Sequence, residues 1–232
     1  MTRTLGIIAL CAILCGAQSL HAQKDKKYSI KTADTAPPME LSEPIQALLA
    51  KSSVQLLDPA GTPICDVWFR KELPTDAVAE QLKTGVTYRE VKQTEILGAI
   101  QFHKDWTDYR QQKVKAGVYT LRLAYQPTDG KHTADVSEFQ DFALITSAKV
   151  DKKSDLMDPK VLHEKSSDSI KSAHPGVFML WPSTKPGKEP TIVSNPNNHW
   201  VVHSRTMVVI AGKATDTPMG IGITLVGHSP VE

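Results

Sequence analysis

About ten short apolar segments, separated by turn-forming residues, constrain the fold of this 232-residue chain more than any other feature. The clearest is Val118–Tyr125, where apolar or aromatic side chains alternate with Thr120, Arg122 and Ala124. A period of two is typical of a half-buried β-strand. Pro, Gly and Asn clusters, without regular helices, lie between the segments, which favours antiparallel pairing. The sequence therefore predicts a mainly β protein, an antiparallel β-sandwich of Ig-like or jelly-roll-like type.

Two or three short helices are expected beside the strands. Each starts after a residue that can cap a helix or has Pro in its first turn, and apolar residues recur at helical spacing in the first and third. The expected helices lie within Ser42–Leu49, Asp76–Lys83 and Asp158–Ile170. They are too short to organise the fold, so we expect them to pack against the strands.

Residues 1–22 have the three parts of a secretory signal peptide: the positive Arg3, the apolar run Leu5–Ala17 and the small Ala22. Glycines and polar residues interrupt the apolar stretch, which is shorter than the roughly 20 residues of a membrane-spanning helix. We therefore expect cleavage near Ala22 and export to a bacterial periplasm or exterior, with no transmembrane segment in the mature chain.

The mature chain is expected to form one domain. Residues 23–40 are polar and basic and end in consecutive prolines, which predicts a flexible leader. Residues 41–232 are expected to form a single β-sandwich domain. Within it, residues 149–173 begin with a charged stretch poor in apolar side chains, which indicates a possible exposed excursion.

Cysteine usage and charge exclude several classes of protein. Cleavage would remove Cys11 and Cys15 and leave only Cys65, so the mature chain cannot form an internal disulfide. Cys65 shares a strand face with Val67 and Phe69, which favours a core residue over a nucleophile. The 27 Lys and Arg nearly balance the 25 Asp and Glu, so no strong positive field exists for nucleic acid.

Two short motifs resemble sites for cofactors or metals. His199 and His203 are four residues apart, but on a strand they would lie roughly 13 Å from each other, too far to share one ion. Gly220-Ile221-Gly222 opens like a dinucleotide fingerprint, yet Leu225 stands at the third glycine position. The sequence predicts a strand here whose glycines leave room for a bulky neighbour, and no metal or cofactor is expected.

The polar segment 104–110 is the most binding-like part of the sequence. Trp106 and Tyr109 lie beside Asp108 and Arg110 between two expected strands. Two exposed rings with polar edges form a platform on which a sugar can stack. An arginine packed between the rings and paired with an aspartate would give the same composition for structural reasons.

A local resemblance supports the fold. Lys115–Leu121 resembles the Pro-Gly-x-Tyr-Thr-Leu strand entry of transthyretin-like and carboxypeptidase-regulatory modules, with Ala116 in place of the proline. Residues 108–144, together with 174–176, are similar to an uncharacterised family of exported bacterial β-sandwich proteins. The resemblance implies export and a sandwich and transfers no catalytic residue. It marks four candidate positions: Asp108, Arg110, His132 and His174.

These features favour an exported, non-enzymatic binding or envelope scaffold protein, whose partner is a small ligand, a glycan or an envelope protein. One alternative is a carbohydrate- or small-ligand-binding module, which requires Trp106 and Tyr109 to be exposed beside a groove. The other is a metal-dependent or hydrolytic enzyme, which requires His132, His174 and nearby carboxylates to converge.

Overall fold

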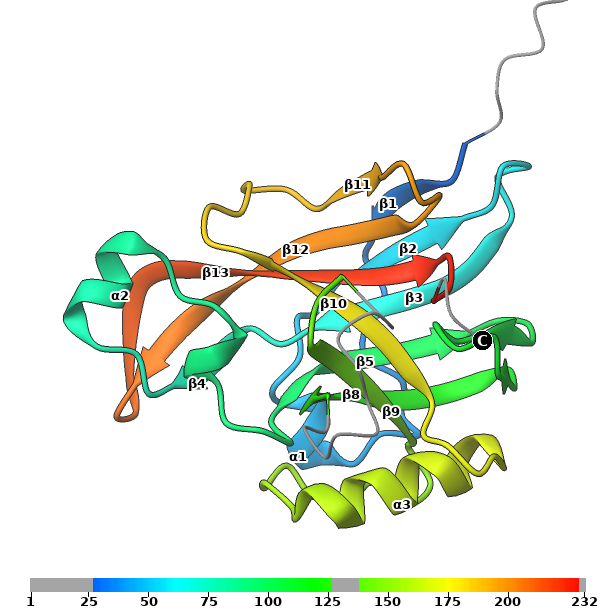
Figure 1. The fold of residues 1–232 in the computed structure, drawn as a ribbon, viewed down its shortest axis with the longest axis horizontal. Helices are drawn as coiled ribbons and strands as arrows, with labels where there is room; N and C mark the ends of the chain where they lie inside the picture. Colours follow the sequence, from blue (N-terminus) through cyan, green and yellow to red (C-terminus); the bar gives the residue numbers. More distant parts are fainter. Residues whose placement is uncertain (1–26, 127–137, 230–232) are drawn as a thin grey trace, which may run out of the picture.

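The computed structural model describes residues 27–126 and 138–229 (Figure 1). The helical elements are α1 (Glu43–Gln46), α2 (Ala79–Thr84), the 3₁₀ turn η1 (Tyr88–Glu90) and α3 (Pro159–Ile170). The strands are β1 (Ser29–Ala33), β2 (Ser53–Leu57), β3 (Pro63–Phe69), β4 (Glu72–Thr75), β5 (Ile96–Phe102), β6 (Trp106–Thr107), β7 (Lys113–Val114), β8 (Gly117–Tyr125), β9 (Asp141–Ser147), β10 (Val177–Ser183), β11 (Thr191–Ser194), β12 (Trp200–Ile210) and β13 (Lys213–Val226).

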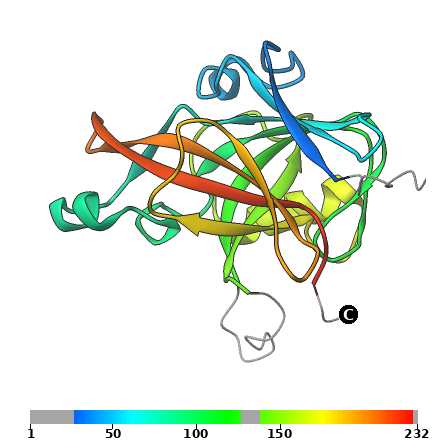
Figure 2. The same cartoon turned by 90° about the horizontal axis from the view of Figure 1, so that it is seen from above.

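The mainly β prediction is confirmed, whereas a sandwich of two separate sheets is not. The described strands form one large sheet in the order β1-β2-β3-β5-β8-β9-β10-β13-β12-β11, with β4 beside β12 and a separate β6-β7 pair. β10 makes the sheet continuous, because Val177–Met179 pair with β9 and Leu180–Ser183 pair with β13. The sheet curls into a half-barrel (Figure 2). Bulges in β12 help such curling, since they bend a strand and increase its twist.

The inner face of the curled sheet holds the main core. Leu121 of β8 and Ile223 of β13 belong to the same buried cluster, so the two halves of the sheet contribute to one core. Cys65 and Val67 are fully buried in it, which confirms the prediction that Cys65 is a core residue. The stability of the described part of the chain therefore rests on packed apolar side chains.

The expected flexible leader contains a strand. Ser29–Ala33 form β1, which pairs antiparallel with β2 over five residues. Just before it, the Tyr28 ring lies 5.5 Å from the Trp200 ring at the start of β12. Pairing with β2 thus orders a part of residues 23–40 whose own sequence is polar. The contact also brings the β1 and β11 edges of the sheet close together (Figure 1).

Two helices cover the outer face of the sheet. Ile45 of α1 is buried against Trp68 in a second cluster, and Leu162 of α3 is buried in a third. The predicted helices in 42–49, 76–83 and 158–170 are confirmed, although α1 and α2 are single-turn or little longer. Among the described residues, no helix has the length and apolar character needed to cross a membrane.

The segment 149–173 packs over the outer face of the sheet through a few buried residues such as Asp151 and Leu162, while most of its residues are exposed. Arg122 is 0% exposed, and its Nε donates to Asp151 Oδ2 over 2.8 Å. β8 is thus buried on both faces, although the alternation of its residues predicted burial of one. The polar face could be buried only because a distant segment supplies a carboxylate for the guanidinium.

Candidate functional site

The two predicted platform residues do not present a pair of exposed rings. Tyr109 is 2% exposed and packs edge-on against the His199 ring, with the centroids 5.5 Å apart. Trp106 is half-buried against the main core, and its indole N–H donates to the Leu225 carbonyl over 2.9 Å. Trp106 and Tyr109 therefore fix β6 and the turn after it to the large sheet.

Asp108 organises the turn that follows Trp106. Its carboxylate accepts the backbone N–H groups of Arg110, Gln112 and Val177 and the Gln112 side-chain amide, over 2.8–3.0 Å. Burial raises the pKa of Asp108, and the four N–H donors oppose that rise. Since both carboxylate oxygens are engaged in these bonds, Asp108 holds backbone in place. The Arg110 residue is exposed beside it.

His174 lies in the exposed turn after α3, and its backbone N–H donates to the Ser172 hydroxyl over 3.3 Å. The same turn approaches the Asp108 loop, because Gln112 donates to the Pro175 carbonyl over 2.8 Å. The structure thus brings the two candidate segments together through backbone contacts. His132 falls outside the described residues. Among residues 27–126 and 138–229, no group of three His, Cys, Asp or Glu side chains is placed to hold a metal ion.

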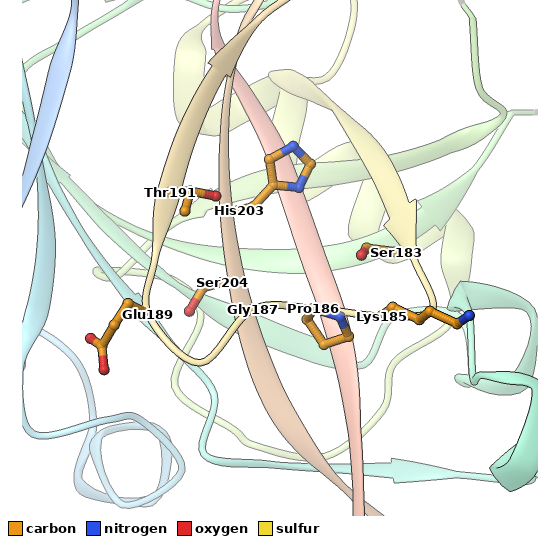
Figure 3. Close-up of a pocket in the computed structure, with 8 residues that line it drawn as sticks. All are labelled: Ser183, Lys185, Pro186, Gly187, Glu189, Thr191, His203 and Ser204. Carbon is orange, nitrogen blue, oxygen red and sulfur yellow. The ribbon is translucent and has the colours of Figure 1, made fainter.

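A pocket of about 170 Å³ lies elsewhere, beside strands β10, β11 and β12 (Figure 3). Residues 184–190 link β10 to β11 and pass across β13 and β12; we call them the strap. The pocket between strap and strands is lined by Ser183, Lys185, Pro186, Gly187, Glu189, Thr191, His203 and Ser204. We call it the His203 pocket.

Strand register explains why these side chains meet. Thr191 pairs with His203, and His203 pairs with Gly222, so all three share the outer face of the sheet. A Cβ on Gly222 would lie 2.8 Å from the His203 ring, and one on Gly220 would lie 2.5 Å from the Ser183 Cβ. Glycine at these positions therefore lets His203 and Ser183 lie directly against β13. This confirms the predicted room for a bulky neighbour.

The polar groups of the His203 pocket are free to bind. Within the described part of the chain, the hydroxyls of Ser183 and Thr191 and the ring nitrogens of His203 make no hydrogen bond to another protein group. The two hydroxyls and the imidazole project over the same space (Figure 3). Burial lowers the pKa of His203, which keeps the ring neutral at pH 7 with one donor and one acceptor.

His199 and His203 belong to different surroundings. His199 is 2% exposed, and its Nε2 lies 2.9 Å from the His228 carbonyl oxygen, whereas His203 faces the pocket. The interpretation that the two do not form one metal site agrees with this placement. Sequence reasoning did not single out His203, although the Pro- and Gly-containing strap at 184–190 was a visible signal of a crossing loop.

Sequence reasoning also missed a second polar cluster, on the outer face of β2 and β3. Asp66 is 3% exposed; its Oδ2 lies 2.6 Å from His103 Nε2, and its Oδ1 accepts the Ser53 hydroxyl over 2.7 Å. Gln55 donates to both carboxylate oxygens. The cluster ties three segments of sheet together, and the Ser53 hydroxyl points at the carboxylate instead of the imidazole. It therefore lacks the geometry of a serine nucleophile with its base.

The chain matches no family model, and a search of curated proteins and of solved structures likewise finds no match. The functional argument therefore rests on the geometry of this molecule. Of the two polar clusters on the outer face of the sheet, the His203 pocket combines free hydroxyls, a free imidazole and space for a ligand.

Proposed function

We propose that this is an exported, non-enzymatic binding protein that takes a small polar ligand in the His203 pocket. The observation that carries the proposal is the set of unpartnered polar groups around one concave space. Thr191 is exposed and Ser183 and His203 are half-buried, so water reaches these groups in the free protein. A ligand that offers matching donors and acceptors can replace that water and keep the groups hydrogen-bonded.

Export is the second element of the proposal. The signal-like residues 1–22 and the resemblance to exported bacterial β-sandwich proteins support a periplasmic or secreted location. A single free cysteine, buried at Cys65, suits an oxidising compartment, because no exposed thiol of the described residues can form an unwanted disulfide there.

A small ligand is favoured over an enzymatic substrate. The pocket brings an imidazole near hydroxyls, but no carboxylate of residues 27–126 and 138–229 is bonded to His203, and Glu189 extends away from it (Figure 3). Nucleophilic catalysis needs a nucleophile hydrogen-bonded to its base, and no such bond is present among the lining residues. The platform of Trp106 and Tyr109 is not favoured either, since Tyr109 is buried.

The test is a thermal-shift screen of the protein purified after expression of the full chain in a bacterium. At least one small polar compound is expected to raise Tm, because binding to the native state stabilises it by mass action. The His203→Ala variant should lose that shift, and His174→Ala, which removes an exposed histidine outside the pocket, should keep it. A flat response of the folded wild type to every class of compound refutes the proposal.

Export is tested on the same material. Fractionation of the expressing cells should place the protein in the periplasm or medium, and mass spectrometry should find its N-terminus near Gln23. An intact N-terminus on protein that stays in the cytoplasm contradicts export. The result does not bear on ligand binding in the His203 pocket.

A further inference from the structure

We propose that the ligand of the His203 pocket is a neutral, hydroxyl-rich ring, a single monosaccharide unit. This inference rests on the proposed binding function and specifies the chemistry of its ligand. It follows from three properties of the pocket: its charge, its size and the kind of hydrogen-bonding groups that it offers.

The charge of the lining selects against ions. The lining contains one cation, Lys185, and one anion, Glu189, which extend to opposite sides of the strap (Figure 3). Both residues are exposed, so water screens their charges. The imidazole between them is neutral at pH 7, because burial lowers the pKa of His203. Neither an anion nor a cation would find a buried opposite charge here, whereas a neutral ligand leaves no charge unpaired.

The size of the pocket limits the ligand to one small ring. Pockets for drug-sized ligands measure roughly 300–1,000 Å³, and the His203 pocket measures about 170 Å³. Because Gly220 and Gly222 have no side chain, Ser183 and His203 lie close against β13. A compact ring can therefore rest on the strands under the edge of the strap.

The hydrogen-bonding groups select for hydroxyls. Ser183 and Thr191 each offer a hydroxyl that both donates and accepts, and neutral His203 offers one donor and one acceptor. Ser204 follows His203 on β12 and pairs with Ile221, so its side chain points to the other face of the strand. Ligand hydroxyls match this mixed set, since each of them also donates and accepts. An apolar ligand would leave the same groups without partners and would be rejected.

The experiment is an NMR titration of ¹⁵N-labelled protein, purified after expression of the full chain. The probes are the neutral sugars glucose, galactose, mannose and N-acetylglucosamine, the anion inorganic phosphate, and the cation choline. A disaccharide ending in the sugar that binds distinguishes a free monosaccharide from the end of a glycan. At least one sugar is expected to shift the signals of Thr191, His203 and Ser204 in a saturable manner.

Two variants and one control locate the binding. Thr191→Val keeps the shape of the side chain but removes its hydroxyl, and it should weaken sugar binding about fivefold or more. His203→Ala should weaken it by at least as much. The matched control His174→Ala should bind like the wild type. Unchanged binding by both pocket variants refutes the placement of the sugar.

The outcomes separate this inference from the proposed function. If phosphate or choline shifts the pocket signals and no sugar does, the binding function stands and the ligand class is wrong. If none of the six probes shifts these signals, the sugar inference is wrong, and the wider thermal-shift screen decides the proposed function separately. If sugar signals shift only at residues outside the pocket, the site is wrong.

Discussion

The Arg122–Asp151 ion pair gives the sharpest test of the fold. The perturbation is Asp151→Ala, which removes the carboxylate and leaves the guanidinium in place. Arg122 is 0% exposed, and it donates two hydrogen bonds to Asp151 and three to the carbonyls of Thr94, Lys153 and Asp155. The three carbonyls hold the guanidinium where it is, so it cannot easily turn to solvent when its counter-charge is lost.

The magnitude follows from burial. Removing one partner of a buried ion pair costs about 3–5 kcal/mol, because the remaining charge is uncompensated. Asp151 also accepts the Thr120 hydroxyl over 2.6 Å, so the variant loses that bond as well. Domains are typically stable by about 5–15 kcal/mol, so the loss is roughly a fifth or more of the total free energy of unfolding. With a urea m-value of about 2 kcal/mol/M, the midpoint should fall by about 2 M.

The assay is urea unfolding followed by circular dichroism and tryptophan fluorescence. The matched control is Glu80→Ala, which breaks the Lys83–Glu80 pair, whose side chains are 75% and 73% exposed. That change should cost under about 0.5 kcal/mol. If Asp151→Ala unfolds within 1 kcal/mol of the wild type, the burial of this pair and the packing of residues 149–158 over β8 are refuted.

Three further predictions concern single side chains. Asp108→Ala leaves three backbone N–H groups without their acceptor and should lower stability by about 2–4 kcal/mol in urea; a change below 1 kcal/mol contradicts the bonding described. The pKa of His203 is lowered by folding, so the unfolded state binds more protons and stability should fall as pH drops below about 6.5. His203→Gln should make the free energy of unfolding depend less on pH in this range. A variant whose stability depends on pH as the wild type's does would refute the lowered pKa of His203. Burial raises the pKa of the Cys65 thiol, so a thiol reagent should label it only after unfolding; rapid labelling of the native protein refutes its burial.

The limits of sequence reasoning are clear at the candidate site. The segment from Trp106 to Arg110 has the composition of a binding platform, but the same residues also suit packing, and only the position of His199 and Phe142 decided that Tyr109 is buried. The His203 pocket joins residues from 183 to 204 on three strands and a crossing loop. No local pattern in the sequence reveals which strands become neighbours.

Helices and strands were predicted well where the sequence pattern that specifies them lies within a few neighbouring residues. The alternation in Val118–Tyr125 identified β8 and its two faces, and Asp158 was expected to start the helix that it caps by accepting the Lys160 N–H. The segment Val86–Val91 is strand-like in sequence but forms a loop with a 3₁₀ turn. There Glu90 accepts the backbone N–H and hydroxyl of Thr87, a local bond that competes with strand pairing.

The sequence by itself determined the mainly β character, most of the strands and the helix starts, because alternation, turns and helix caps act between near neighbours in the chain. Only the tertiary structure decided that the strands curl into one sheet, that Arg122 is buried with Asp151, and that His203 faces a pocket. These outcomes depend on contacts between residues distant in sequence, such as the pairing of β10 with both β9 and β13. Their free energies are set by desolvation and packing in the assembled molecule, and no single segment carries that information.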